Sequence, residues 1–484
     1  MAVLLRASVL SDDEKAVVSR LAAKIRKDKP GLDLLDKYFD AKQRLKHIGL
    51  AVPPELRIFE TVVNIPHMAV MEPAQRQELR TFYRAGDSTV PDLALREAWE
   101  FNNLSSESST LQVERGIFGR SYVTVGWNGD DPQHPLIRVE DPRSIGVDVD
   151  PLHRRMRAFM RIYRDDDAGV TRGTLLLPDE TIHMVRGQRG WEVTDSDGYG
   201  RDRHGLGVVP AVMFLNRRRS ASWTGRSEMT DVIGLTDGIA RLVTNMQVGA
   251  ESHALPSYIL SGVASDAFKD RDGNILPVWE AYFTAIKAIA STDAKVHQIS
   301  AGDLKNFTES VDSMMNWCAA VLGLPTRFMG RHTANPAAEG AIRADEFRLT
   351  KNAEWKNRFD GDSWSWTMAL EERFRTGKWG PANSIRAIYH DPGTPTYGQR
   401  ADAVTKLRAA GALSLRGVWE ELGWDDARMD REEERLAAEA ADPTVMAALA
   451  EVTRARDVGA ALPGPQADGG GGAAGRQSGV ASFA

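Results

Sequence analysis

The chain has 484 residues, a formal net charge of -6 and a charged fraction of 26%. A chain of this length has room for about two to four domains and a sizeable core. Its mild acidity excludes a protein that holds nucleic acid or a membrane surface through an overall basic charge. The single cysteine, Cys318, excludes a disulfide scaffold and a CxxC metal site.

The N-terminal end predicts neither a signal peptide nor a membrane anchor. Its apolar run, Met1–Leu5, is short, and the acidic residues Asp12, Asp13 and Glu14 follow soon after. No later run approaches the roughly 18 apolar residues of a membrane-spanning helix. We therefore expect a protein that is made in the cytosol and has no membrane segment.

Helical patterns fill the first part of the chain. Residues 11–50 place apolar side chains on one side and charges on the other, and Pro53 and Pro54 break this pattern. A second helix is expected over 55–70. Another begins at Pro91, a residue suited to a first helical turn, and a further one covers 107–119.

Short β-type segments follow, from residue 120 to about residue 215. Ser121–Trp127 is rich in β-formers, and Leu136–Val139 alternates between apolar and polar residues. We expect turns at Asp148–Asp150 and at Asp165–Asp167. Further strands are expected at 156–163, 174–177, 182–185 and 191–193. Their near-regular spacing predicts a mostly antiparallel β domain.

Two later helices carry a one-sided apolar stripe and bracket a mixed insertion. The first covers 226–253, and Asp303 can cap the second, which covers 303–322. The insertion, 257–299, combines short strands with a helical piece. The simplest arrangement is an antiparallel helix pair with the insertion at its tip.

A loop at 324–334 separates this pair from a long helical pattern. Gly323 and Pro325 end the preceding helix, and Asn335 and Pro336 cap and open the next one. A helix over 336–376 would span roughly 60 Å, more than one compact core needs. A loop held between two such helices indicates a part that projects and contacts something.

The C-terminal part predicts a short strand at 385–389 and helices at 397–410, 415–422 and 425–441. These helices form a small all-helical cap. From Pro463 onward the chain is rich in Gly, Ala, Ser and Gln, and we expect it to be disordered.

No motif of the sequence predicts an enzyme. There is no GxxxxGK[ST], no GxSxG and no HExxH. The aspartate pairs Asp148/Asp150 and Asp165/Asp167 can hold a divalent metal, but solvated turns are the favoured interpretation because no calcium loop surrounds them. We therefore expect no catalytic residue, no cofactor and no metal.

For the other polar residues and the cysteine, we favour structural or solvent-exposed roles over functional ones. His183 alternates with apolar neighbours, which is typical of a structural histidine in a strand. The triplet Arg217–Arg219 is expected to be a solvated loop, with a phosphate-binding patch as the alternative. Cys318 lies on an apolar stripe and is expected to be a buried, inert thiol.

Five segments, in this order, carry a family resemblance: GRSYVTVGWNGDDPQHPLIRVEDP (119–142), HGLGVVPAVMFLNR (204–217), GRSEMTDVIGLTDGIARLVTNM (225–246), VLGLPTRFMGRHTANPAAEGAIRADE (321–346) and KLRAAGALSLRGVWEELGW (406–424). Together they resemble the portal proteins of tailed bacteriophages, in particular the group common in long-tailed phages of Gram-positive hosts. The resemblance covers roughly residues 30 to 440, and the succession of segments is its specific feature. The part before residue 60 matches only loosely.

The resemblance implies an α+β ring subunit of the portal type. It divides the chain into a helical part (1–119) and a β part (120–224) of the wing, stem helices (225–256 and 303–323), a clip (257–302), a tunnel loop (324–335), a long helix with a strand returning to the wing (336–396), a helical crown (397–442) and a tail (443–484).

The resemblance also implies roles for individual residues. In the tunnel loop, facing DNA, it places Arg327, Arg331, His332, Thr333 and Asn335. In the clip, contacting partners, it places Asp270, Asp272, Asn274 and Trp279. In the stem packing it places Leu235, Ile239, Leu242, Met246, Phe307, Val311 and Met314. Two partners remain open for the loop arginines: DNA phosphates in passing, or acidic residues of the next subunit.

The implied function is a dodecameric ring at one capsid vertex, which nucleates procapsid assembly and lets DNA in and out. Its implied partners are further copies of itself, double-stranded DNA, the large terminase subunit, a head-tail adaptor and the major capsid and scaffolding proteins. It would hydrolyse nothing and would reside in the virion after assembly in the host cytoplasm. Two rival classes stay open, namely a metal-dependent nucleic-acid enzyme using the aspartate pairs and another capsid-associated adaptor ring.

Overall fold

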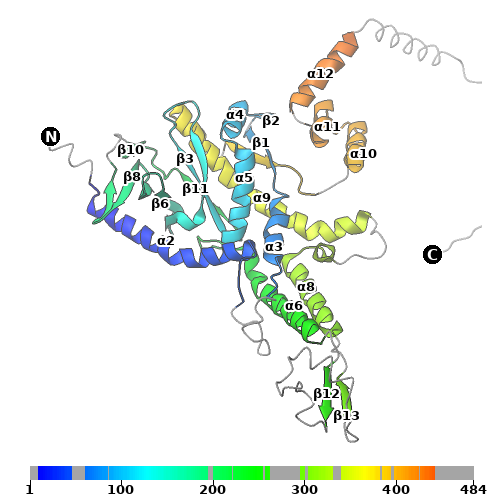
Figure 1. Cartoon of the computed structure of the whole chain (residues 1–484). Helices are drawn as coiled ribbons and strands as arrows, with labels where there is room; N and C mark the ends of the chain where they lie inside the picture. Colours follow the sequence, from blue (N-terminus) through cyan, green and yellow to red (C-terminus); the bar gives the residue numbers. More distant parts are fainter. Residues whose placement is uncertain are drawn as a thin grey trace, which may run out of the picture. The chain divides into compact units, whose positions relative to one another are not determined.

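The computed structural model describes residues 9–45, 60–85, 87–194, 200–220, 222–253, 257–261, 295–299, 304–330, 339–381, 384–393, 397–424 and 426–441. The chain divides into two units, residues 1–393 and 394–484. Figure 1 gives the order of their helices and strands. The mixture of helices and sheets confirms the α+β class at that level.

The first helix, α2 (Asp12–Phe39), begins with a capping box. The backbone N–H of Glu14 donates to Ser11 Oγ at 3.2 Å, and the backbone N–H of Ser11 donates to the Glu14 carboxylate at 2.7 Å. The helix is shorter than expected because the chain turns at Ala41, whose φ is 57°. Its buried face includes Val18 and Leu21, which lie in one cluster with residues of the largest sheet.

The next helix, α3 (Ile65–Ala74), begins later than expected. Asn64 caps it by accepting a hydrogen bond from the backbone N–H of His67 at 3.2 Å. The expectation of a helix from residue 55 is therefore wrong for 60–64, and residues 55–59 lie outside the described part of the chain.

A three-stranded sheet follows that the sequence did not predict as a unit. It has the order β14-β1-β2, from β14 (Ile385–Tyr389), β1 (Leu79–Arg84) and β2 (Asp87–Pro91). Phe82 pairs with Ala387 in antiparallel register. Pro91 ends β2 and does not open a helix; Asp92 instead caps α4 (Leu93–Phe101), accepting from the backbone N–H of Leu95 at 3.1 Å.

Helix α5 (Leu104–Phe118) ends as expected at Gly119. This glycine has a φ of 77°, and a Cβ there would lie 2.7 Å from the backbone of Arg226. A glycine is thus required both by the left-handed backbone and by the close approach of the chain at Arg226.

The β region forms two antiparallel sheets. One has the order β11-β3-β4, from β11 (Ala211–Leu215), β3 (Arg120–Gly126) and β4 (Leu136–Glu140). The other has the order β10-β8-β7-β6-β5, with β9 paired to β8. Its strands are β5 (Ile145–Asp150), β6 (Arg155–Asp165), β7 (Val170–Leu176), β8 (Glu180–Gly187), β9 (Gly190–Val193) and β10 (Arg201–Arg203). The antiparallel prediction is confirmed, but Asp148 and Asp150 belong to a strand, β5, and the turn follows them.

The long helix α9 (Glu339–Thr376) has 38 residues, or roughly 57 Å at 1.5 Å per residue. Its Trp364 is 1% exposed and packs edge-on against Trp99 at 4.9 Å and Phe214 at 5.0 Å between ring centroids. These rings come from α9, α4 and β11, so the helix joins the β14-β1-β2 sheet and the β11-β3-β4 sheet into one core.

The described part of the first unit also contains short 3₁₀ turns, namely η2 (Pro142–Ser144), η3 (Glu228–Asp231) and η4 (Thr326–Met329). Of the insertion 257–299, only β12 (Ser257–Ser261) and β13 (Lys295–Ile299) are described, as an antiparallel pair.

The second unit contains α10 (Tyr397–Ala409), α11 (Leu415–Glu421) and α12 (Asp426–Ala441), which confirms the three expected helices. Ser414 caps α11, and the rings of Trp419 and Trp424 stack at 5.6 Å. Arg428 lies over the Trp424 ring at 4.1 Å. No helix among the described residues is both long enough and apolar enough to cross a bilayer.

Candidate functional site

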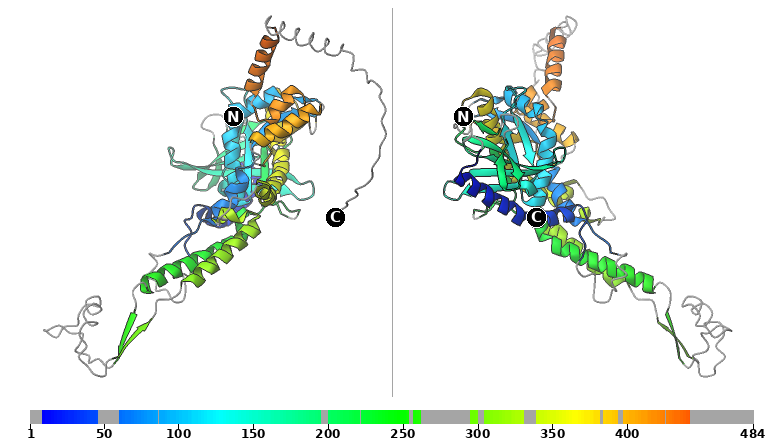
Figure 2. Two further views of the ribbon diagram at one scale, coloured as in Figure 1. Left: turned by 90° about the vertical axis from the view of Figure 1, so that its right-hand side faces the viewer. Right: turned by 60° about the vertical axis from the view of Figure 1, so that its left-hand side comes forward.

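The helices α6 (Ile233–His253) and α8 (Lys305–Leu322) lie side by side (Figure 2), and we call this pair of helices the stem. Their apolar stripes face each other, as the sequence periodicity predicts. Ile239 of α6 is 1% exposed, and Cys318 and Ala319 of α8 are fully buried. Burial raises the pKa of the Cys318 thiol to about 11, so it is a protonated, inert thiol at neutral pH.

The seven residues expected in stem packing do not all contribute equally. Ile239 lies in the buried core of the stem, and Leu235, Val311 and Met314 pack partly buried against it. The remaining three are half-buried and lie outside this core: Leu242, Met246 and Phe307.

The loop after α8 begins as part of the same core. Gly323 ends the helix with a φ of 71°, and Leu324 and Met329, each 7% exposed, join the stem cluster. The described part of the loop, up to Gly330, is thus folded onto the root of the stem and contains η4. The expectation of a projecting loop is therefore wrong for residues 324–329, because their apolar side chains Leu324 and Met329 are buried in the stem cluster.

Arg327 finds its partners within its own chain. Its guanidinium forms an ion pair with Glu346 of α9, lies 3.6 Å from the carboxylate of Asp345 and sits 5.3 Å from the centre of the Phe328 ring. Arg76 also contacts Glu346, at 3.1 Å. The sequence left two partners open for Arg327, namely DNA phosphates and acidic residues of the next subunit. The structure adds a third partner, the acidic residues of α9 in the same chain, because α9 passes beside the loop.

Other expected site residues cannot be placed. Arg331, His332, Thr333 and Asn335 of the loop lie outside the described residues, as do Asp270, Asp272, Asn274 and Trp279 of the insertion. Their roles stay predictions.

A network of buried charges, not predicted from the sequence, lies where α9 meets α5 and the root of the stem. Arg115 of α5 forms an ion pair with Asp360 of α9, each side chain being 2% exposed, and donates to the Gln77 side chain at 2.7 Å. Lys356, one turn earlier on α9, forms an ion pair with Glu228 of η3, each side chain being 4% exposed. Lys356, Asp360 and Trp364 are four residues apart on α9, so they lie on the same buried face. This spacing is the feature of the sequence from which the buried charges could have been predicted.

Arg217 extends this network. Its guanidinium lies 2.9 Å from Glu228 and also pairs with Asp231. The expectation of a solvated loop is therefore wrong for Arg217, whose side chain anchors the chain entering the stem. Burial by itself would raise the pKa of Glu228, but the charges of Lys356 and Arg217 outweigh it and lower that pKa.

Three of the four aspartates that the sequence considered for metal binding, Asp148, Asp150 and Asp165, contact basic side chains of the same chain. Asp148 pairs with Arg20 at 2.6 Å, and Asp165 pairs with Arg172 at 2.6 Å. Hydrogen bonds from His153, Leu152 and Arg157 hold the pKa of Asp150 well below its usual range. Within the described ranges, no group of three or more His, Cys, Asp or Glu side chains is placed to hold a metal.

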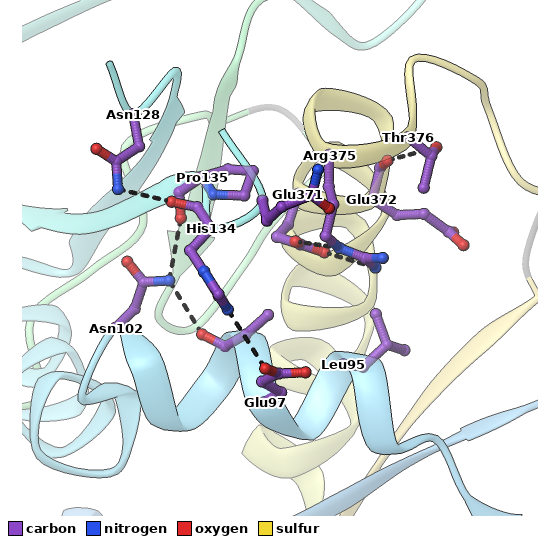
Figure 3. Close-up of polar contacts among 12 residues, drawn as sticks. Leu95, Glu97, Asn102, Asn128, His134, Pro135, Glu371, Glu372, Arg375 and Thr376 are labelled. Carbon is purple, nitrogen blue, oxygen red and sulfur yellow. Dashed lines mark hydrogen bonds and ion pairs between the residues drawn. The ribbon is translucent and has the colours of Figure 1, made fainter. Parts of the chain in front are cut away.

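A second set of polar contacts lies around the β3–β4 loop, α4 and α9 (Figure 3). The His134 ring contacts the Asp131 carboxylate at 2.7 Å through Nδ1 and that of Glu97 at 3.4 Å through Nε2. The Asp131 hydrogen bond raises the pKa of His134. Nearby, burial raises the pKa of Glu371, whose carboxylate accepts from Arg375 at 2.8 Å. His183 is half-buried in β8, and burial lowers its pKa.

The family model described as "Phage portal protein, SPP1 Gp6-like" matches residues 20–444. The portal protein of Mycobacterium phage D29 is 33% identical over 413 residues, which cover 82% of this chain and 83% of the relative. The portal protein of Mycobacterium phage L5 is 33% identical over 387 residues, 77% of this chain and 78% of the relative.

Among solved structures, a chain of the virion of the native gene transfer agent particle aligns with a TM-score of 0.44 at 13% identity, covering 77% of this chain and 93% of that chain. A chain of the neck of the empty gene transfer agent particle, computed with C6 symmetry, aligns with a TM-score of 0.45 at 12% identity, covering 80% and 98%.

Proposed function

This chain belongs to the SPP1 Gp6-like family of phage portal proteins, and we propose that it forms the dodecameric ring at one vertex of a capsid, through which the genome enters and leaves. The observation that supports this most is the family match over residues 20–444. In this proposal the protein is a component of the virion, assembled in the host cytoplasm, and has a structural role without catalysis.

The same proposal assigns a role to each segment of the chain. Residues 225–256 and 303–323 form the stem, and residues 324–335 form a loop that faces the DNA. The insertion 257–302 docks the terminase during packaging and a head-tail adaptor afterwards. Residues 397–442 form the crown, and the ring contacts capsid and scaffolding proteins when it nucleates assembly.

The charge of the chain suits a channel. A lumen that lets DNA slide must not hold phosphates tightly, because each neutralised phosphate adds affinity through counterion release. The chain is mildly acidic, with a net charge of -6, and the described loop arginine, Arg327, is already neutralised by Glu346. Both features limit tight binding of the duplex.

The first test is the assembly state of the purified full chain. Mass photometry and negative-stain electron microscopy should show closed rings. A species that stays monomeric at high concentration would contradict the proposal.

A second test separates the loop from the ring. Deleting residues 333–337 should leave rings intact but impair genome packaging or retention when the variant replaces the native protein in phage production. A deletion of equal length at 469–473, in the glycine-rich tail, is the matched control. If the loop deletion abolishes rings, the loop is structural and its assigned role is wrong.

A further inference from the structure

A cleft of about 570 Å³ opens between β11 and α9. Its apolar lining includes Val209 and Val212 from the β11 region and Phe359 from α9. The indole rings of Trp366 and Trp379 line it as well, stacked at 5.5 Å with 5° between their planes, and each is 41% exposed. Large apolar side chains are therefore left in contact with solvent around a concave surface.

Three arginines line the same cleft: Arg154, Arg155 and Arg218. All three are exposed, and no described carboxylate forms an ion pair with them. Arg218 lies over the ring of Trp223, which also lines the cleft, at 6.0 Å. Arg157, two residues further along β6, shows the contrast, because it pairs with Asp150 at 2.8 Å. Arg154 has a φ of 53°, a left-handed backbone conformation that favours glycine. The cleft thus presents unpaired positive charge beside apolar walls, which suits an acidic segment of a protein.

This chain exposes such an acidic segment at the turn between β6 and β7. Asp165 holds the turn together, since it accepts from the backbone N–H of Ala168 at 3.0 Å and pairs with Arg172. The side chain of Asp166 is 87% exposed and lies 3.0 Å from the exposed Arg164, and Asp167 is exposed at the tip. The turn therefore presents carboxylates outward from a rigid hairpin.

The cleft and the turn lie at opposite ends of one strand. Arg155 begins β6 and Asp165 ends it, so at about 3.3 Å per residue they are roughly 33 Å apart. A strand paired on both sides, with β5 and β7, cannot bring its two ends together. The complementary charges can meet only between copies, in a head-to-tail contact of the kind that closes rings.

We propose that the acidic turn Asp165–Asp167 of one copy docks in the arginine-lined cleft of the next copy. The inference rests on the proposed ring and identifies one of the surfaces that join its subunits. Each copy then supplies one turn and receives one, so every cleft of a closed ring is filled. The indole walls exclude water from the ion pairs, which strengthens them relative to exposed pairs.

Charge reversal tests the contact. Arg155→Glu and Asp166→Arg should each raise the concentration at which half of the protein is in rings by about tenfold or more, the change expected for losing about 1.4 kcal/mol. The double variant should return this concentration to within about threefold of the native value, because the pair is restored with its signs exchanged. Arg189→Glu, which reverses an exposed arginine in the β8–β9 turn, is the matched control and should have little effect.

The outcomes are distinct. If native rings form and both single variants assemble like the control, the proposed contact is wrong while the ring stands. If the native chain forms no rings at all, the proposed function itself fails. Equal melting temperatures of the variants confirm that the substitutions act on assembly and not on folding.

Chemical cross-linking gives an independent measurement. In a Cys318→Ala background, Arg155→Cys and Asp167→Cys together should let a short bismaleimide link neighbouring copies into a ladder of covalent multimers on a denaturing gel. Each single-cysteine variant should give no ladder. Intact rings of the double-cysteine chain that yield no ladder would overturn the proposed contact.

Discussion

The buried ion pair between Lys356 and Glu228 allows a quantitative prediction about the root of the stem. Lys356→Met keeps most of the apolar length of the lysine side chain but removes its charge. Glu228 then remains buried, with 4% of its side chain exposed, and retains Arg217 at 2.9 Å as its cationic partner. The expected result is a loss of stability, because the buried carboxylate of Glu228 keeps only one of its two cationic partners.

The magnitude follows from the geometry. Removing one partner of a buried ion pair costs about 3–5 kcal/mol, and the remaining arginine places the expected loss at the low end, about 3 kcal/mol. Lys356→Met combined with Glu228→Gln leaves no unpaired charge at this point, because Arg217 still pairs with Asp231. The double variant should therefore lose only about 1 kcal/mol.

Urea unfolding of the full chain, followed by tryptophan fluorescence, measures these free energies. The native chain, the two single variants and the double variant form a complete cycle, from which we expect a coupling energy of about 2 kcal/mol or more. A loss below about 1 kcal/mol for Lys356→Met, or a double variant whose loss equals the sum of the single losses, would refute the reasoning.

Three further outcomes are expected. Gly119→Ala should destabilise the chain by about 2 kcal/mol in urea unfolding, because φ is 77° and the new Cβ meets the backbone of Arg226. Gly129→Ala is the control, since a Cβ there meets nothing within 4 Å. A loss for Gly119→Ala no larger than that of the control would contradict this account. His134→Gln should lower the melting temperature most below about pH 6.5; the folded pKa of His134 is raised by Asp131, so its contribution is complete below the unfolded pKa and fades as pH rises through the folded one. A difference that grows with pH would reverse this sign. Cys318 should react with a thiol reagent only after unfolding, and rapid labelling of the native chain would show an open stem.

Local signals in the sequence determined several elements of this protein. The stripes of apolar residues at helical spacing predicted α6, α8 and α9, and the short β-type segments between turns predicted β3, β4, β6, β7, β8 and β9. Gly119 marked the end of α5 because a left-handed residue is needed there. The helix pair α6 and α8 was predicted for the same reason, since each helix depends on neighbours within a few residues along the chain. The packing of Leu324 and Met329 into the core of this pair was not predicted, because the loop was expected to project.

Only the tertiary structure decided the partners of distant residues. Phe82 pairs with Ala387, Lys356 finds Glu228, and Arg327 finds Glu346, all without any local pattern that names the partner. The acidic turn and the arginine-lined cleft could likewise be recognised as separate, complementary surfaces only from the structure, because β6 holds them at its opposite ends. A helix or strand is selected by the spacing of its own side chains, whereas a buried charge or an unpaired strand edge is satisfied by whatever group the folded chain brings beside it.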